Sequence, residues 1–246
     1  MHESDQMAKV VIVTGASRGL GLEICKKLLE DNYRVVGLAR SASEATNRLL
    51  ETKGNFVFRN FDLSDTARIH GECQDIVQAY GRPYGLINNA AVGLDGILTT
   101  MHESDIKRLL TVNVEAPILL CKYLSRPMLL NRCGRIVNVS SIIASTGYKG
   151  LAVYAATKSA MIGLTKSFCR EVGKASITVN CVAPGFMETE MTDGIDAELL
   201  KSIRRRSPLG ELTDVEQVAA SVAYLLSDSA SRITGSVLTV DAGSTA

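Results

Sequence analysis

Short apolar runs rich in β-branched residues alternate with amphipathic helical patterns along most of this chain. Strands are expected at Lys9–Val13, Arg34–Leu38, Asn55–Asn60, Gly85–Asn88, Arg135–Val139, Thr178–Val182 and Val237–Val240, with helices at Leu20–Glu30, Thr66–Tyr80, Ser104–Asn131, Tyr154–Val172 and Asp214–Leu226. Strands and helices that alternate at this spacing form βαβ units. The pattern therefore predicts an α/β fold in which a parallel sheet carries helices on both faces.

No linker and no shift in composition divides the 246 residues. We therefore expect one domain over residues 9–246, preceded by a disordered tail over residues 1–8. Residues 186–210 interrupt the rhythm after a strand end, where a mobile substrate lid would lie. The arginines at 204–206 in this stretch are interpreted as a solvated helix face, with a site for an anionic substrate tail as the alternative.

The formal net charge is +1, so the chain has no strong field to attract nucleic acid or an anionic membrane surface. No apolar run approaches the length of a membrane span, and Met1–Lys9 lacks the apolar core of a secretory signal. The six cysteines are scattered, and the three histidines lie apart from other ligand-type residues. These features predict reduced thiols, no metal site and a cytoplasmic protein.

Tyr154 and Lys158 form a Y-x-x-x-K pair, and Ser141 lies thirteen residues before the tyrosine. Residues four apart on a helix share a face, so the ammonium would lie beside the phenol. A cation there favours the phenolate and lowers the pKa of the tyrosine below its ordinary value of about 10. Such a group can give a proton to a carbonyl oxygen, although the spacing alone also recurs by chance on exposed helices.

A glycine-rich turn follows the first expected strand. It runs Thr14-Gly15-Ala16-Ser17-Arg18-Gly19-Leu20-Gly21, with the glycines spaced as G-x-x-x-G-x-G. Small residues let the backbone approach a pyrophosphate, and a helix N-terminus offers N–H groups and the positive end of its dipole. The turn therefore predicts a nucleotide site, with an ordinary tight turn as the alternative.

The second strand is followed by Arg40 and Ser41, with no acid from residue 35 to residue 43. A carboxylate near this point holds the ribose 2′-hydroxyl of NAD, whereas an arginine accommodates the 2′-phosphate of NADP. Arg40, with Arg18 as a second cation, therefore favours NADP(H) over NAD(H). Asp62-Leu63 follows the third strand, where an acid can accept a hydrogen bond from the adenine amino group.

The motifs together resemble the short-chain dehydrogenase/reductase family over 9–243. The matching segments are Thr14–Gly21, Asp62-Leu63, Asn88–Ala91, Asn113, Ile136–Ser141, Tyr154 with Lys158, and Pro184-Gly185, in this order. The resemblance implies a Rossmann-type, doubly wound, seven-stranded parallel sheet in a three-layer αβα sandwich.

The same resemblance implies a catalytic tetrad of Asn113, Ser141, Tyr154 and Lys158. Tyr154 would be the general acid in reduction, and Ser141 would hydrogen-bond the substrate oxygen. Lys158 would lower the pKa of the tyrosine and hold the nicotinamide ribose. Asn113 would distort its helix and hold a water that resupplies the proton through Lys158.

The cofactor site implied by the resemblance extends beyond the glycine-rich turn. Its expected residues are Gly15, Ser17, Arg18, Gly19, Leu20, Gly21, Arg40, Ser41, Asp62, Leu63, Asn89, Ala90, Ala91, Tyr154, Lys158, Pro184, Gly185 and Thr189. Thr189 would reach the nicotinamide carboxamide, with Phe186-Met187 as an apolar wall. The chain departs from the family in having Ala91 and Ala242 where glycine is common, and in ending soon after Gly243.

Within the family, Gly134–Ser141 and Val182–Thr192 look most like the 3-oxoacyl-[acyl-carrier-protein] reductases. This likeness implies NADPH-dependent reduction of a 3-oxoacyl thioester on an acidic acyl carrier protein, which Arg132 and Lys174 would help to dock. It also implies a homotetramer assembled through the long helices over Ser104–Asn131 and Tyr154–Val172.

Two other functions remain open at the level of the sequence. The same chemistry could act on a different ketone, such as a polyketide, sugar, steroid or small molecule, because fold does not settle substrate. The third hypothesis is a catalytically idle nucleotide-binding subunit. The complete tetrad argues against an idle subunit, which has no chemical reason to keep all four groups.

Overall fold

Seven parallel strands form one sheet in the order β3-β2-β1-β4-β5-β6-β7 in the computed structural model, which describes residues 8–187 and 197–246. The strands are β1 (Val10–Thr14), β2 (Arg34–Ala39), β3 (Phe56–Asn60), β4 (Gly85–Asn88), β5 (Gly134–Val139), β6 (Ile177–Pro184) and β7 (Val237–Val240). The strand order reverses between β1 and β4, the point at which doubly wound sheets bind their ligands. The predicted sheet is therefore confirmed.

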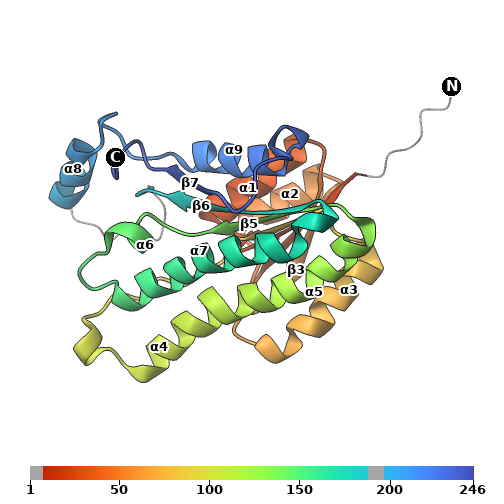
Figure 1. Ribbon diagram of the computed structural model, residues 1–246, viewed down its shortest axis with the longest axis horizontal. Coiled ribbons are helices and arrows are strands. Elements are labelled where there is room, and N and C mark those ends of the chain that lie inside the picture. The colour runs from red at the N-terminus through yellow and green to blue at the C-terminus, as the bar shows by residue number, and fades with distance from the viewer. Residues whose placement is uncertain (1–7, 188–196) are drawn as a thin grey trace.

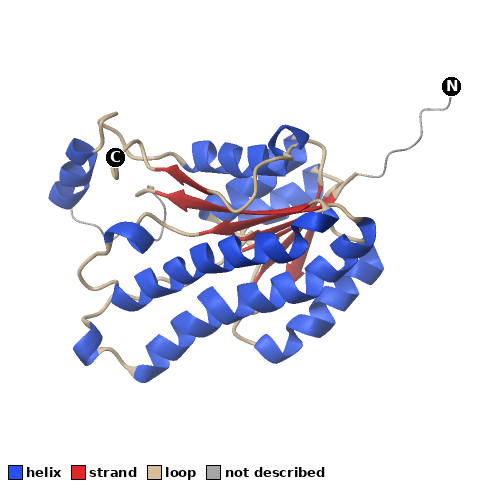
Figure 2. Ribbon diagram, viewed as in Figure 1, coloured by secondary structure: helices blue, strands red, loops and turns tan. Residues whose placement is uncertain are grey.

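Helices cover both faces of this sheet and give the molecule three layers (Figure 1). One face carries α1 (Gly19–Glu30), α2 (Glu44–Thr52) and α9 (Val215–Leu226), and the other carries α3 (Ile69–Tyr80), α4 (Glu103–Leu110), α5 (Ala116–Asn131) and α7 (Ala152–Val172). The shorter elements are α6 (Ile143–Thr146), α8 (Ala197–Arg206), the 3-10 turns η1 (Thr66–Arg68), η2 (Leu98–Thr100), η4 (Gly173–Ala175) and η5 (Asp228–Ala230), and the π-helical turn η3 (Thr111–Glu115). Figure 2 shows β5, β6 and β7 ending on the side of the molecule where α6 and the C-terminus lie.

The central strands are buried on both sides, which explains their nearly continuous apolar sequences. Every residue of β1 and β5 is buried. One apolar core packs α1 and α9 against the sheet around Val11 and Ile24, and a second packs α3 and α5 on the opposite face around Met128 and Ile136. Helices on both faces thus hold the strand ends in a fixed relation to one another.

Two helical features differ from the expected pattern. The single helix expected over Ser104–Asn131 is divided by η3, where the Ala116 N–H bonds to the Thr111 carbonyl five residues earlier. Apolar residues keep the same helical spacing on either side of this turn, so the sequence pattern does not indicate that the helix is divided. Helix α2 was not expected, because its nine residues are mostly polar, although a capping box formed by Ser43 and Thr46 marks its start.

Some expectations fall on residues 1–7 and 188–196, which lie outside the described residues. They include nearly all of the expected tail and the middle of the expected lid. In the described part of the lid, α8 buries Ile203 and exposes the arginines at 204–206. No helix in the described ranges is long and apolar enough to cross a membrane, and no group of metal-ligating side chains occurs there. All six cysteines are free, and four of them are buried.

Candidate active site

A turn with three glycines joins β1 to α1 at the switch point of the sheet. Gly15 and Gly19 adopt left-handed φ angles of 69° and 50°, which glycine adopts without strain. A Cβ atom at Gly21 would lie 2.1 Å from the Gly15 carbonyl oxygen, so the start of α1 packs against the turn only with glycine there. Within the described residues, no side chain caps the first N–H groups of α1 and its first turn has no acid. The turn therefore fits the phosphates of a dinucleotide.

The Thr14 hydroxyl fastens this turn to the segment that follows β4. Its Oγ1 accepts hydrogen bonds from the backbone N–H groups of Asn89 and Ala90, both at 3.0 Å, and donates to the Ile87 carbonyl at 3.2 Å. Asn89 Nδ2 returns a hydrogen bond to the Thr14 carbonyl at 2.9 Å. The segment Asn89–Ala91, expected to bind the cofactor, thus lies beside the glycine-rich turn. This role of Thr14 was not among the predictions from the sequence.

Arg40 and Ser41 follow β2 and are exposed, and Asp62 follows the neighbouring strand β3. The Asp62 carboxylate accepts hydrogen bonds from the backbone N–H and hydroxyl of Ser64, at 2.9 and 2.8 Å. The Ser64 N–H lowers the pKa of Asp62 most, and the positive charges of Arg40 and Arg108 lower it further. A cation and an anion therefore lie close together where β2 and β3 end.

Two consecutive serines follow β5, and the structure gives them different partners. Ser140 is buried, and its Oγ donates to the Lys158 carbonyl at 2.7 Å, which fastens the end of β5 to α7. Ser141 is half-buried, and its Oγ accepts from the Ile143 N–H at 3.2 Å. No hydrogen bond donated by the Ser141 hydroxyl occurs among the described residues. Ser141 is therefore the serine that can donate to a substrate oxygen.

Lys158 lies one helical turn after Tyr154 on α7, and its side chain is 4% exposed. Its Nζ donates to the carbonyl of Val139, the last residue of β5, at 2.9 Å and lies 5.6 Å from the centre of the Tyr154 ring. Burial lowers the pKa of Lys158 to about 8. The ammonium thus still carries most of its charge at neutral pH.

The expected depression of the Tyr154 pKa is not found. Burial raises the pKa of Tyr154 to about 12 instead. The physical reason is that desolvation disfavours the phenolate. The charged Nζ of Lys158 is hydrogen-bonded to the Val139 carbonyl rather than to the phenol. Tyr154 is therefore protonated at neutral pH and ready to act as an acid.

Asn113 lies inside the π-helical turn η3 and is 2% exposed. Its Oδ1 accepts from the Val92 N–H at 2.8 Å, and its Nδ2 donates to the Val92 carbonyl at 2.9 Å and to Thr157 Oγ1 at 3.2 Å. The expected distortion of the helix at Asn113 is therefore present. Asn113 joins the segment after β4 to α7, and Thr157 is a contact that the sequence analysis did not assign.

The segment that follows β6 lies beside the loop that carries Ser141. The Ile142 N–H donates to the Pro184 carbonyl at 3.0 Å, and the Gly185 N–H donates to the Val240 carbonyl at 2.8 Å. A Cβ atom at Gly185 would lie 2.8 Å from Asp241 Cα, so glycine is required for this approach. Thr189 lies outside the described residues.

The other expected site residues lie where the sequence analysis places them. Arg18 and Ser17 are in the glycine-rich turn, Leu20 is buried in the first turn of α1, and Leu63 is buried after β3. Because parallel strands end at one edge, the turns after β1 to β6 meet there. The arrangement offers a proton donor, a second hydroxyl and a buried cation next to a dinucleotide-type turn, which is the set needed for hydride transfer to a carbonyl.

Replacing Lys158 by methionine removes a charge that is buried on folding. Because folding lowers the pKa of Lys158 from 10.5 to about 8, the unfolded chain holds this proton more tightly, and raising the pH stabilises the wild type relative to Lys158→Met. Between about pH 7.5 and about pH 9.5, the free energy of unfolding of the wild type should rise by about 2 kcal/mol relative to that of Lys158→Met, as measured by urea unfolding.

Lys166→Met, on an exposed part of the same helix, is the control for loss of a lysine side chain. A difference between wild type and Lys158→Met that does not change with pH would contradict the burial of a charged lysine.

Comparisons with known proteins agree with this geometry. A family model described as Enoyl-(Acyl carrier protein) reductase matches residues 15–245. The 3-oxoacyl-[acyl-carrier-protein] reductase FabG of Salmonella typhimurium is 37% identical over 237 residues, which is 96% of each chain. Carbonyl reductase family member 4 of Xenopus tropicalis is also 37% identical over 237 residues, which is 96% of this chain and 98% of the relative.

A solved short-chain dehydrogenase/reductase from Serratia marcescens matches 98% of this chain and 99% of its own, with a TM-score of 0.89 and 31% identity. The fold, the site and these relatives agree on one family. This chain belongs to the short-chain dehydrogenase/reductases and is an oxidoreductase that acts on a carbonyl or hydroxyl group with a nicotinamide cofactor.

Proposed function

We propose that this protein is an NADPH-dependent reductase that converts a 3-oxoacyl thioester, carried on an acyl carrier protein, to the 3-hydroxyacyl form. The observation that supports this most is the joint placement of Ser141, Tyr154 and Lys158, held by the bonds from Ser140 to Lys158 and from Lys158 to Val139. The choice of substrate is supported by the FabG relatives, which are named as 3-oxoacyl-[acyl-carrier-protein] reductases.

The residues of the site divide the reaction between them. A nicotinamide cofactor, when bound at the glycine-rich turn, would supply the hydride that adds to the carbonyl carbon. Tyr154 gives its proton to the carbonyl oxygen, and Ser141 donates a hydrogen bond to the same oxygen as negative charge develops on it. Lys158 then stabilises the tyrosinate through its charge, which is worth more in a buried site than in water. Asn113 keeps the helix of η3 and the segment after β4 in place beside these groups.

Tyr154→Phe should lower kcat/KM about a thousandfold, because the substrate oxygen loses its proton donor while the ring is kept. The assay is NADPH oxidation with an acetoacetyl thioester, an acetoacetyl-carrier conjugate, a sugar ketone and a steroid ketone. Tyr224→Phe, at an exposed tyrosine of α9, is the matched control. Turnover of a free ketone alone would favour the alternative substrates, and equal activity of Tyr154→Phe and wild type would overturn the catalytic role.

The preference for NADP(H) is supported by the charges at the end of β2. Arg40 is exposed there, Arg18 lies in the neighbouring glycine-rich turn, and no acid occupies the end of β2 itself. Asp62, which follows the neighbouring strand β3, is close enough to Arg40 for their charges to interact. Asp62 therefore limits the positive field but does not occupy the position that accepts a ribose 2′-hydroxyl in NAD sites.

Arg40→Asp should reverse the cofactor preference, because the carboxylate repels a 2′-phosphate and accepts from a 2′-hydroxyl. We expect kcat/KM for NADPH to fall about a hundredfold and that for NADH to be equal or higher. Lys53→Asp, with its exposed side chain at the opposite edge of the sheet, controls for the change in net charge. A wild type that prefers NADH would sink the assignment.

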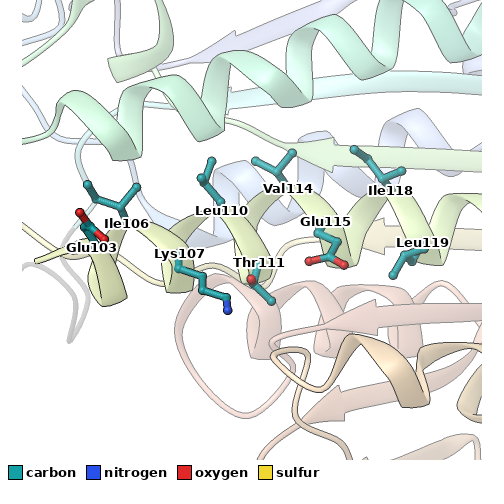
Figure 3. A pocket seen from close by; sticks show the side chains of 9 residues that line it. All are labelled: Glu103, Ile106, Lys107, Leu110, Thr111, Val114, Glu115, Ile118 and Leu119. Atoms are coloured by element: carbon teal, nitrogen blue, oxygen red, sulfur yellow. The ribbon is translucent and has the colours of Figure 1, made fainter.

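Self-association is the second part of the proposal. A groove of about 590 Å³ runs along α4, η3 and the start of α5 (Figure 3). Ile106, Leu110, Val114 and Ile118 form one row along it, and Leu110 and Ile118 are 46% and 42% exposed. An exposed apolar row of this length suits the same surface of a second copy.

The charges beside this row suit a two-fold axis. Lys107 lies four residues before Thr111 and Glu115 lies four residues after it, and both are exposed at the groove. Two antiparallel copies of this helix, centred at Thr111, would therefore set each Lys107 against Glu115 of the partner subunit. The proposed homotetramer needs at least one further interface besides this one.

The positions of the two expected carrier-docking residues also fit a dimer in which these helices pair. Arg132 Nη2 donates to the Lys174 carbonyl at 3.1 Å, so the two expected docking residues are neighbours. They precede β5 and β6, at the edge of the sheet opposite to Tyr154. Antiparallel pairing of the helices would bring Arg132 of the partner subunit toward the edge that carries Tyr154.

Lys107→Glu and Glu115→Lys should each weaken the assembly at least tenfold, because two pairs of like charges then face each other. The double variant should restore it, with sedimentation velocity as the measurement. Lys122→Glu, outside the groove on α5, is the control. Single variants should also lose turnover of the carrier-bound substrate more than that of a small thioester. Equal sedimentation of the wild type, both single variants and the double variant would exclude this interface.

A further inference from the structure

Thr157 lies on α7 between Tyr154 and Lys158 and is completely buried. Its Oγ1 donates to the Tyr154 carbonyl at 2.7 Å, a local bond that threonines often make inside helices. Oγ1 also accepts from Asn113 Nδ2 at 3.2 Å, and this contact joins residues 44 positions apart. The local bond alone would be structural, but the second bond links Thr157 to the tetrad.

The bonding of Asn113 leaves little freedom for its amide group. Its oxygen and one N–H bond to the Val92 backbone, and the other N–H has Thr157 Oγ1 as its acceptor. Because the Thr157 hydroxyl gives its single hydrogen to Tyr154, it can only accept from Asn113. Without that acceptor, an amide N–H in a buried site would lose its partner, which is costly.

We infer that Thr157 is a positioning residue for the reaction, which holds Asn113 and the Val92 backbone in register with the turn of α7 that bears Tyr154 and Lys158. The inference rests on the proposed roles of these tetrad residues. The Asn113 amide joins three segments far apart in the chain: its own π-helical turn η3, the loop after β4 through Val92, and helix α7 through the Thr157 hydroxyl. Thr157 touches none of the reacting atoms and acts through Asn113.

Thr165 provides a matched comparison on the same helix. It is also completely buried, its Oγ1 donates to the Met161 carbonyl at 2.8 Å, and it accepts from Asn138 Nδ2 at 2.9 Å. Removing either hydroxyl therefore deletes one local bond and leaves one buried asparagine N–H unpaired. Only Thr157 is joined to the tetrad in this way, so the two variants separate a positioning role from a purely structural one.

The experiment compares Thr157→Val, Thr157→Ser and Thr165→Val. Thr157→Val should lower kcat about tenfold with little change in KM for NADPH, and Thr157→Ser, which keeps the hydroxyl, should stay within about twofold of wild type. Thr165→Val should lower stability to a similar extent and keep kcat within about twofold. Thr157→Ala carries the same expectation as Thr157→Val if valine prevents folding.

A second readout does not depend on turnover. The Val92 N–H bonds to Asn113 Oδ1, so its hydrogen exchange reports the orientation of the asparagine. Mass spectrometry of peptides covering Val92 should show faster exchange in Thr157→Val than in Thr165→Val. Unchanged exchange at Val92, or an equal loss of kcat in both variants, would overturn the inference. A wild type that reduces none of the substrates would refute the proposed function alone, because the exchange result would still decide the role of Thr157.

Discussion

The buried ammonium of Lys158 is the group on which the arrangement of the site depends. Burial lowers its pKa to about 8, so folding around this charge costs free energy. The Val139 carbonyl compensates part of that cost by accepting from Nζ, and Ser140 holds the Lys158 backbone at the same strand end. A strand offers a carbonyl in this way only where it leaves the sheet. The position of the lysine is thus tied to the residue at which β5 ends.

A line of buried polar side chains keeps the neighbouring strand ends in register. Asn88 Nδ2 donates to Asn138 Oδ1 at 2.8 Å, and Asn138 Nδ2 donates to Thr165 Oγ1, which joins β4, β5 and α7. Thr14 makes the equivalent link between β1 and the segment after β4. Breaking any of these bonds would leave a buried group unpaired at a cost of about 1–3 kcal/mol. These buried bonds therefore add to the apolar core in holding strands β1, β4 and β5 and helix α7 together.

The fold and most of the site could be predicted because both depend on local patterns. β-branched runs predicted all seven strand positions, and helical spacing placed Lys158 one turn after Tyr154. The spacing that favours Ser141 agrees with the commitment of the Ser140 hydroxyl to Lys158. The rise in the Tyr154 pKa and the bond from Asn113 to Thr157 depend on burial and on contacts between distant segments. Rules based on the spacing of residues in the sequence therefore cannot predict that rise in pKa or that hydrogen bond.

The π-helical turn connects the two parts of the proposal. Thr111, Val114 and Glu115 line the exposed groove, whereas Asn113 in the same turn points into the buried contact with Val92 and Thr157. A π-turn holds one more residue than an α-helical turn, and its geometry persists only where the surroundings favour it. In the proposed assembly, a second copy packed over this groove would support that turn from outside while Thr157 supports it from inside. Subunit association and the placement of Asn113 would then depend on the same five residues.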